Sequence, residues 1–481
     1  MEGGHHLLVR RFPVCRPGYL PGGVPEVKPS DGGYAGKKIL VLGLARSGVA
    51  VARLLHRLGA EVTVNDRKPR AEAPEAEELE KAGIQVVLGG HPEGLIHEGW
   101  DLLVKNPGIP YRVPLLQEAE TRGIPVVTEV EIAWQLTEAS MIGITGSNGK
   151  TTTTSLVGRM LARGGIPARV AGNIGMALSE VAPGMDQEEW LVSELSSFQL
   201  KGTRQFRPRI GALLNLVPAH LDYHGSMEDY LESKGKLFAN QQPGDIAVLN
   251  RDSDVCRRLA PQLRGDVWWF SRQEPVDRGL MVKQGWVTAR LPDGEELSLL
   301  PASQVRLPGI HMENALAASA IALAAGCPAD ALREELRTFT GVEHRLEFVA
   351  TVDGVRYYND SKATNGKAAT SAMESFTEPI VLIAGGLDRG VDFRELVPVF
   401  QKRLKGIVTY GEAGDVLLKR AEEAGVPLRE RAEEIADAVT RASRLAAAGD
   451  VVLLSPACAS WDLYTSFEER GSIFKQAVHN L

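Results

Sequence analysis

Short apolar runs alternate along most of the chain with segments whose apolar residues recur at helical spacing. The first cycle runs from KKILVLGL at residue 37 through a helical pattern over residues 47–58 to AEVTVND. Short buried runs separated by amphipathic helices are typical of parallel βαβ sheets. The pattern therefore predicts an α/β fold with mostly parallel sheets.

Three such cycles follow one another, which predicts three α/β domains. The second begins with MIGITG near residue 141 and ends with a helical run over residues 314–325. The third contains VRYYNDS, PIVLIAGG, KGIVTYG and DVVLLSP. A chain of 481 residues is long enough for about three domains, which we place at residues 36–135, 136–340 and 341–481. Residues 1–35 contain seven Gly and five Pro and are expected to form a disordered extension.

Composition narrows the range of partners. The chain has 54 Lys and Arg against 61 Asp and Glu, a net charge of −7 without a basic stripe, so nucleic acid is not an expected partner. Four cysteines without C-x-x-C spacing argue against a zinc site or a disulfide framework and favour a reducing cytoplasm. No apolar run reaches the roughly 20 residues of a membrane span. We expect a cytoplasmic monomer that binds small molecules.

The sharpest motif is ITGSNGKT at residues 144–151, between an apolar strand and a helical stretch. Its glycines let backbone amides curl around phosphate oxygens, while Lys150 supplies charge to the β- and γ-phosphates and Thr151 a hydroxyl to Mg²⁺. The strict G-x-x-x-x-G-K-[ST] pattern has Gly where this chain has Ile144. A turn that binds nothing does not need Lys followed by Thr, so the motif predicts ATP binding. The expected ATP contacts are Gly146, Ser147, Asn148, Gly149, Lys150, Thr151 and Thr152.

The variant T-G-x-x-G-K-T resembles the phosphate loop of the Mur ligase superfamily, and the resemblance extends over about residues 37–481. Its motifs are GNIG at 172–175, ELSSFQL at 194–200, HLD at 220–222, HRLE at 344–347, NDSKATN at 359–365 and SPACASWD at 455–462. The last two are similar to those of the members that add D-glutamate to UDP-N-acetylmuramoyl-L-alanine. The resemblance implies a Rossmann-like UDP-binding domain, a central P-loop ATPase-type domain and a C-terminal Rossmann-like domain. It also implies ATP-dependent ligation through an acyl phosphate in peptidoglycan precursor synthesis.

Candidate metal ligands lie in the middle domain. Glu194 ends an apolar strand, where its carboxylate would face the ligand edge of the sheet and suit Mg²⁺, although a Glu after a strand is usually a solvated loop charge. The resemblance implies that His220 binds a second Mg²⁺, a cation that seldom takes imidazole. It further implies that Lys234, by pattern an exposed helix lysine, is carbamylated and supports a metal; Lys236 is the alternative. The expected metal set is Thr151, Glu194, His220 and Lys234.

The first domain carries GLARSG at residues 43–48 after a strand, with Asp66 ending the next strand. This is similar to a dinucleotide fingerprint but lacks its middle Gly, so NAD binding is weakly supported and a plain βα turn is the alternative. The resemblance assigns the loop to the UDP moiety instead. The UDP-substrate contacts it implies are Arg46, Ser47, Asp66, Asn106, Pro107 and Gly108, with Asn173 and Ser196 from the middle domain.

The resemblance also places nucleotide contacts in the third domain. Asp360 would hold ribose, Lys362 a phosphate, and Arg345 would stabilise charge on the transferring phosphoryl group. Asn314 would lie near adenine, although its motif, residues 309–315, is one residue shorter than the family's G-x-H-N-x-x-N-A. The expected catalytic set is Lys150, Glu194, His220, Lys234 and Arg345.

For D-glutamate, the resemblance implies Lys362, Thr364, Arg389, Ser460 and Phe467. Arg389 stands where the family usually has Lys, and its guanidinium can grip a carboxylate with two parallel N–H groups.

Three other functions stay open. A nucleotide-switched binding protein would hydrolyse ATP without a UDP-sugar, but does not require the set of Glu194, His220 and Lys234. A related ligase could add another amino acid, or glutamates to folate; the NDSKATN and SPACASWD stretches argue against it. A nicotinamide dehydrogenase is the weakest alternative, because the middle Gly is missing.

Overall fold

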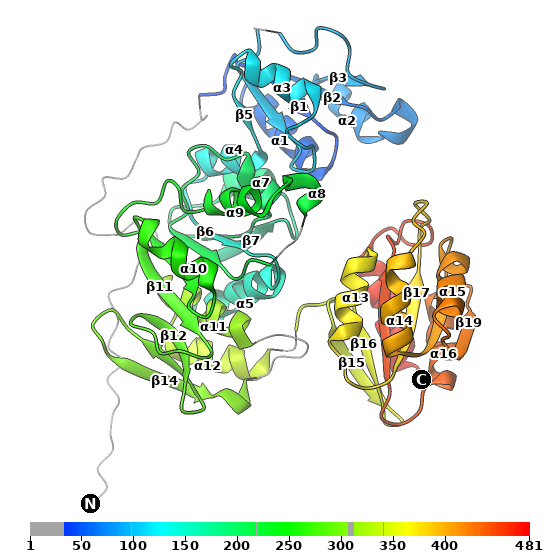
Figure 1. Ribbon diagram of the computed structural model, residues 1–481. Helices are drawn as coiled ribbons and strands as arrows, with labels where there is room; N and C mark the ends of the chain where they lie inside the picture. The colour runs from blue at the N-terminus through cyan, green and yellow to red at the C-terminus, as the bar shows by residue number, and fades with distance from the viewer. Residues whose placement is uncertain (1–32, 98, 218–219, 306–311, 340) are drawn as a thin grey trace, which may run out of the picture. The chain divides into compact units, whose positions relative to one another are not determined.

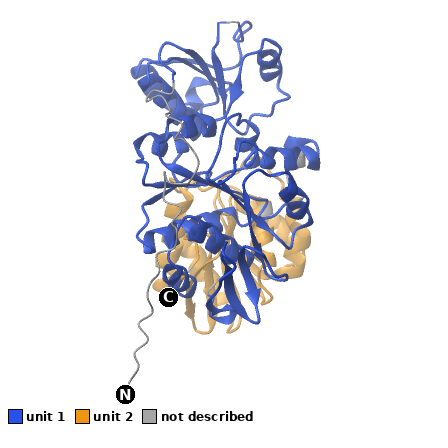
Figure 2. Ribbon diagram, turned by 90° about the vertical axis from the view of Figure 1, so that its left-hand side faces the viewer, with its two compact units in different colours: residues 1–305, 311–338 blue, residues 306–310, 339–481 orange. Residues whose placement is uncertain are grey.

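The computed structural model describes residues 33–97, 99–217, 220–305, 312–339 and 341–481, which form three sheets in chain order (Figure 1). The first two sheets belong to one compact unit, whose described residues end at residue 338, and the third belongs to a second unit, whose described residues are 339 and 341–481 (Figure 2). The predicted α/β class with three domains in series is confirmed. No helix within these residue ranges has the length and apolar content needed to cross a bilayer.

The first sheet has five parallel strands in the order β3-β2-β1-β4-β5. Because β1 pairs with both β2 and β4, the loops after β1 and β4 lie side by side where the chain connections diverge, the usual ligand position of such sheets. The strands are β1 (Lys38–Leu42), β2 (Glu61–Asp66), β3 (Gln85–Leu88), β4 (Leu102–Lys105) and β5 (Val126–Val127). The helices are α1 (Arg46–Arg57), α2 (Glu75–Lys81), α3 (Pro114–Thr121) and α4 (Glu129–Leu136).

The described chain begins within the predicted N-terminal extension. Tyr34 is buried in the first core, and its hydroxyl donates a hydrogen bond to Gln135 of α4. Residues 1–32 of the predicted extension lie outside the described residues.

The second sheet has nine strands in the order β14-β13-β12-β11-β10-β9-β6-β8-β7. Strands β6 to β12 pair in parallel, and their almost continuous apolar sequences fit a sheet covered by helices on both faces. Strands β12 to β14 form an antiparallel meander at one edge. The strands are β6 (Ser140–Thr145), β7 (Ala168–Gly172), β8 (Trp190–Glu194), β9 (Ile210–Leu213), β10 (Ile246–Asn250), β11 (Asp266–Ser271), β12 (Gly279–Lys283), β13 (Trp286–Arg290) and β14 (Glu296–Pro301). The helices are α5 (Lys150–Arg163), α6 (Leu178–Val181), α7 (Ser197–Lys201), α8 (Leu221–His224), α9 (Met227–Gly235), α10 (Asp254–Leu259), α11 (Met312–Ala324) and α12 (Ala329–Thr338).

The third sheet has six strands in the order β15-β16-β20-β17-β18-β19, with β15 antiparallel and the others parallel. Helices α13 to α15 pack on one face and α16 and α17 on the other. Because β20 lies between β16 and β17, the loops after these three strands meet at one edge of the sheet. The strands are β15 (Glu347–Val352), β16 (Val355–Asn359), β17 (Ile380–Gly385), β18 (Leu404–Tyr410), β19 (Leu428–Arg431) and β20 (Val451–Ala457). The helices are α13 (Gly366–Glu374), α14 (Val397–Arg403), α15 (Gly414–Glu423), α16 (Ile435–Leu445) and α17 (Phe467–His479).

Candidate active site

The predicted phosphate loop lies between β6 and the N-terminus of α5. Gly149 caps the helix with a φ of +80°, a left-handed conformation that favours glycine. The Nζ atom of Lys150 folds back over the loop and donates to the carbonyls of Gly146 at 2.9 Å and Ser147 at 3.1 Å. Thr151 and Thr152 are buried in the first turn of α5. The strand, loop and helix therefore offer backbone amides and one ammonium group to an anion.

Side chains from α9, from α11 and from the segment after β9 fix this loop. The Ser147 hydroxyl lies 3.0 Å from the Tyr230 hydroxyl, and the Asn148 N–H donates to Asn215 Oδ1 at 2.9 Å. A Cβ atom at Gly149 would lie 2.2 Å from Asn314 Oδ1, so only glycine allows this close approach. Asn314 thus lies against the phosphate loop, and its contact with adenine stays a prediction. Residues 309–311 of its motif lie outside the described residues.

Glu194 is the last residue of β8, and its side chain is unusually placed for a carboxylate. The residue is 2% exposed; Oε1 accepts from Asn173 Nδ2 at 2.9 Å, but the buried Oε2 has no hydrogen-bond partner among the described residues. A buried oxygen without a partner is costly, and a hard cation such as Mg²⁺ would satisfy it. Glu194 pairs with Ile144 across the sheet, one strand from the phosphate loop. The residues present therefore fit a metal at this edge.

Lys234 is buried in the last turn of α9, against the phosphate loop. Its Nζ atom donates to Thr145 Oγ1 at 3.2 Å and to the Gly146 carbonyl at 2.9 Å, and lies 4.8 Å from the ring centre of Tyr230. Burial lowers the pKa of Lys234 to about 6, assisted by the Lys150 charge and opposed by Glu194. At neutral pH most of the amine is therefore uncharged and nucleophilic.

The alternative lysine has other partners. Lys236 follows the end of α9, and its Nζ atom donates to the carbonyls of Lys201 at 2.7 Å and Thr203 at 3.1 Å. Among the hydrogen bonds of the described residues, those of Lys234 reach the phosphate loop, whereas those of Lys236 do not. The pattern-based interpretation of Lys234 as an exposed helix lysine is wrong, because the residue is 1% exposed.

His220 precedes α8 with a left-handed φ of 56°. Its ring lies 4.9 Å from the ring of Phe198 and 6.4 Å from that of Tyr230, so it borders the same aromatic cluster as Lys234. Within the described ranges, no three His, Cys, Asp or Glu side chains converge on one point. A metal here would need ligands besides these side chains, such as nucleotide phosphates.

A serine, a histidine and an aspartate form a hydrogen-bonded chain beside this site. The Ser197 hydroxyl lies 2.9 Å from His224 Nε2, and His224 Nδ1 lies 2.6 Å from Asp229. The order resembles a hydrolytic triad, but Ser197 is 2% exposed and cannot meet a substrate. These hydrogen bonds instead join α7, α8 and α9 to one another. His220 directly precedes α8, and Lys234 lies in α9.

The loops after β1, β2 and β4 converge in the first sheet, and most of the predicted UDP-substrate contacts lie there. The Asp66 carboxylate accepts from the N–H groups of Leu44 at 2.6 Å and Lys68 at 2.9 Å. Asn106 Nδ2 donates to the Ser47 hydroxyl at 3.2 Å, and Asn106 Oδ1 accepts from the Gly108 N–H. Ser47, Asp66 and the segment 106–108 are therefore brought together.

Three other predicted UDP-substrate contacts have different surroundings. Arg46 directly precedes Ser47 at the start of α1, but its side chain is exposed and lines a surface pocket with Arg53 and Glu180. Asn173 is bonded to Glu194, and Ser196 caps α7 two residues further on. These two residues lie next to Glu194.

Lys105 is a buried lysine at the end of β4 that was not predicted as functional. Its Nζ atom donates to the Pro107 carbonyl at 3.1 Å and to the Tyr223 hydroxyl at 3.3 Å, and it lies over the ring of Tyr111. Tyr223 also donates to the Pro107 carbonyl, so the two side chains join the predicted UDP loop to α8. The only signal in the sequence is a lysine at the end of an apolar strand.

The burial of Lys105 predicts a pH effect on stability. Burial, with the Lys201 charge, lowers the pKa of Lys105 from 10.5 to about 7. Between pH 7 and 10.5 Lys105 holds a proton in the unfolded chain that it has released in the folded chain. The free energy of unfolding of the wild type therefore rises with pH in this window. We expect Lys105→Met to lose thermal stability relative to wild type as pH rises from 7 to 10. Lys81→Met, at an exposed position, is the control. A difference in thermal unfolding midpoint between wild type and Lys105→Met that stays constant from pH 7 to 10 would contradict the effect.

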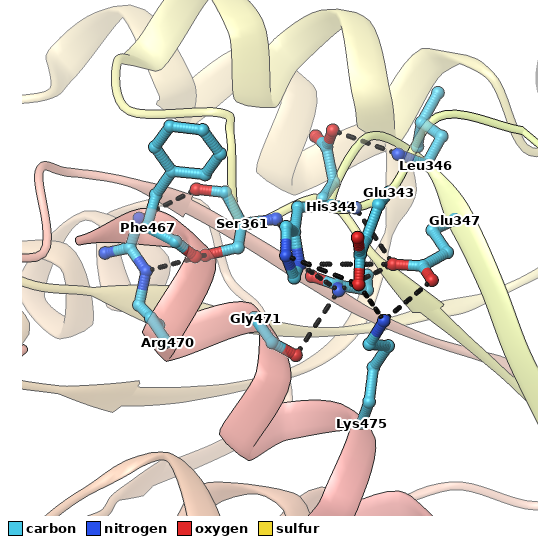
Figure 3. A network of polar contacts seen from close by, with 11 residues as sticks. Glu343, His344, Leu346, Glu347, Ser361, Phe467, Arg470, Gly471 and Lys475 are labelled. Atoms are coloured by element: carbon cyan, nitrogen blue, oxygen red, sulfur yellow. Dashed lines mark hydrogen bonds and ion pairs between the residues drawn. The ribbon is translucent and has the colours of Figure 1, made fainter. Parts of the chain in front are cut away.

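In the second unit, a polar network fixes the loop that carries Arg345 (Figure 3). His344 and Leu346, on either side of Arg345, have left-handed φ values of 61° and 43°, a strained conformation for such residues. The Glu347 carboxylate accepts from the His344 N–H at 2.9 Å and from Lys475 at 3.1 Å. The conformation of the loop is thus imposed by its neighbours, including α17.

Asp360 supports the same loop from the end of β16. Its carboxylate accepts from the Leu346 N–H at 3.2 Å and from the Ser455 hydroxyl at 2.9 Å, and burial raises its pKa to about 7.

Lys362, another predicted nucleotide contact, lies near an aromatic ring. Its Nζ atom is 5.9 Å from the ring centre of Phe467.

The predicted D-glutamate contacts come from the loops that meet at one edge of the third sheet. Lys362 and Thr364 follow β16, Arg389 follows β17, and Ser460 follows β20. The buried Arg470 donates to the Ser361 hydroxyl and to the Cys458 carbonyl, which ties two of these loops together. Phe467 begins α17, and its carbonyl accepts from Ser361.

Family models match successive parts of the chain. They are the Mur ligase MurD-like N-terminal domain over residues 37–128, the Mur ligase middle domain over 144–322 and the Mur ligase glutamate ligase domain over 344–458. Among solved structures, UDP-N-acetylmuramate-alanine ligase MurC from Thermotoga maritima is 18% identical and aligns with a TM-score of 0.51. The alignment covers 92% of this chain and 99% of that one, which shows a shared fold.

Curated relatives are similar over nearly the whole chain. A UDP-N-acetylmuramoylalanine–D-glutamate ligase from Halalkalibacterium halodurans is 50% identical over 446 residues, 92% of this chain and 98% of the relative. Ligases of the same name from Geobacillus kaustophilus and Bacillus subtilis are 49% and 47% identical, covering 93% and 92% of this chain and 98% and 97% of their own lengths. The chain therefore belongs to the Mur ligase family, and within it to the UDP-N-acetylmuramoylalanine–D-glutamate ligases.

Proposed function

We propose that this protein is a ligase that uses ATP to join D-glutamate to UDP-N-acetylmuramoyl-L-alanine in peptidoglycan precursor synthesis. The observation that carries the chemistry is the buried Lys234, which is bonded to the phosphate loop and interacts with Glu194, whose Oε2 has no partner among the described residues. A nucleotide switch needs neither group. The choice of substrates is supported by the names of relatives that match nearly the whole chain.

The reaction proceeds in two steps. The L-alanine carboxylate attacks the γ-phosphorus of ATP, which forms an acyl phosphate and releases ADP. The amine of D-glutamate then attacks the acyl carbon, and the tetrahedral intermediate expels phosphate, leaving the amide and one proton. The protein contributes mainly alignment and neutralisation of charge. Lys150 acts on the β- and γ-phosphates, and Arg345 stabilises the transferring phosphoryl group.

Mg²⁺ would be held by Thr151, Glu194, His220 and a carbamylated Lys234, in two sites near the phosphate loop. When bound, it neutralises phosphate charge and orients the reacting oxygens. The uncharged amine of Lys234 suits attack on CO₂: a C–N bond forms, the nitrogen releases one proton, and the product is an anionic carbamate that could serve as a ligand. Asn173 orients the Glu194 carboxylate through its hydrogen bond.

The remaining residues select the substrates. Ser47, Asp66 and residues 106–108 would bind the UDP moiety, with Asn173 and Ser196 nearer the reacting end. Arg345, Asp360 and Lys362 would contact the nucleotide, while Lys362, Thr364, Arg389, Ser460 and Phe467 would bind D-glutamate. We also propose that the protein is cytoplasmic and monomeric. Light scattering of the purified chain would test the monomeric state.

Phosphate release with Mg²⁺-ATP and UDP-N-acetylmuramoyl-L-alanine tests this function. We expect release with D-glutamate and none with L-glutamate, L-lysine or no amino acid, together with the mass of the coupled product. Release that does not depend on the UDP-sugar would favour a nucleotide switch. Phosphate release that depends on another amino acid would support the ligase reaction but assign it a different amino-acid substrate.

A further inference from the structure

Trp461 is the most exposed large apolar side chain in the described part of the chain. It lies in the loop after β20 and is 65% exposed. Val391, in the loop after β17, and Leu463, two residues beyond Trp461, are also exposed, at 44% and 49%. Because β17 and β20 are paired, both loops leave the same edge of the sheet, where the proposed D-glutamate contacts lie.

Trp461 contacts a cation in the neighbouring loop. The guanidinium carbon of Arg389 lies 5.0 Å from the centre of the Trp461 ring, within the range of a cation–π interaction. Within the described residue ranges Arg389 forms no salt bridge, although acidic residues lie in its own loop and in the loops after β18 and β20. Their carboxylates accept from backbone N–H groups instead: Asp388 from Gly390 at 2.8 Å, Glu412 from Asp388 at 3.2 Å, and Asp462 from Glu412 at 3.2 Å. The guanidinium therefore keeps its N–H donors for a ligand.

An arginine on an exposed loop has many rotamers, and a carboxylate must freeze them on binding. A planar aromatic face restricts the guanidinium in advance, because arginine stacks on such faces while its N–H groups stay available. Contact with one ring thus lowers the entropy lost when the arginine grips a carboxylate with two parallel hydrogen bonds.

We propose that Trp461 is a positioning residue that holds the Arg389 guanidinium ready for the side-chain carboxylate of the incoming D-glutamate. This inference rests on the proposed function. On this account two residues together determine the affinity for an amino acid with an anionic side chain. Arg389 binds the carboxylate, and Trp461 orients Arg389.

The test is a steady-state comparison of Trp461→Leu, Trp461→Phe and wild type. Trp461→Leu should raise the KM for D-glutamate roughly three- to tenfold, and leave kcat and the KM values for ATP and the UDP-sugar within about twofold. Trp461→Phe should stay close to wild type, because it retains an aromatic face. Trp286→Leu, a 44%-exposed tryptophan in β13, is the matched control, and thermal unfolding confirms that each variant is folded.

A double-mutant cycle separates positioning from direct contact. In an Arg389→Met background, Trp461→Leu should produce no further rise in the KM for D-glutamate. If Trp461→Leu raised the KM for D-glutamate equally in both backgrounds, or left it unchanged in the wild-type background, the inference would be overturned. Wild-type turnover with D-glutamate would still uphold the proposed function in that case. Absence of that wild-type turnover would overturn both.

Discussion

Replacing Lys150 with methionine is expected to slow phosphate release by about a thousandfold while leaving the fold intact. The Lys150 Nζ atom lies over the phosphate loop, where it would neutralise charge that grows on the β- and γ-phosphates as the phosphoryl group leaves. Methionine keeps the length and flexibility of the side chain and removes only the charge. The measurement is turnover at saturating D-glutamate and UDP-sugar, with the thermal unfolding midpoint recorded alongside.

Lys81→Met, on the surface of α2, is the matched control and should retain wild-type turnover, because its ammonium pairs only with an exposed Glu77 among the ion pairs described. A Lys150→Met enzyme within tenfold of wild type would contradict the assignment of the phosphate loop.

Lys234→Met is expected to reduce turnover roughly a hundredfold, whereas Lys236→Met should retain most of the activity. Lys234 bonds to Thr145 and Gly146 at the phosphate loop, while Lys236 bonds to backbone carbonyls in and after α7. The two variants make the same chemical change two positions apart. Equal losses in both would indicate that the effect comes from packing of α9 rather than from the site.

Labelling with ¹³C-bicarbonate tests the modification itself. Because the pKa of Lys234 is lowered to about 6, the amine is mostly uncharged at pH 8 and can capture CO₂. A carbamate signal should appear in the wild type and in Lys236→Met, and be lost in Lys234→Met. Absence of the signal in the active wild-type enzyme would show that the lysine acts unmodified.

Local motifs explain why much of the fold and the phosphate loop could be predicted. A strand, a glycine loop and a helix are adjacent in sequence, so ITGSNGKT already contains the geometry that the structure shows. Buried parallel strands appear as apolar runs, and α16 has its buried residues at the expected spacing, with Ile435, Ala438, Val439 and Ala442 facing the core.

Features that depend on distant contacts could not be predicted in this way. Lys234 and Lys236 lie two positions apart, and only the end of α9 at Gly235 and the packing against β6 distinguish them. The edge strands β12 to β14 were missed, because a meander with one open face gives weaker apolar runs than a buried sheet. Tyr34 and Trp461 carry no local signal, and Lys105 carries only that of a lysine at the end of an apolar strand, since the partners of all three lie in other elements.

The central claim is that the protein activates a substrate carboxylate through its phosphate loop, and oxygen transfer tests it most directly. UDP-N-acetylmuramoyl-L-alanine labelled with ¹⁸O in the alanine carboxylate is incubated with Mg²⁺-ATP and D-glutamate, and the released phosphate is analysed by mass. An acyl phosphate predicts one ¹⁸O atom in each phosphate, because the carboxylate oxygen that attacked phosphorus leaves with it. Phosphate without ¹⁸O would show that water attacks ATP directly, and would contradict the ligase mechanism.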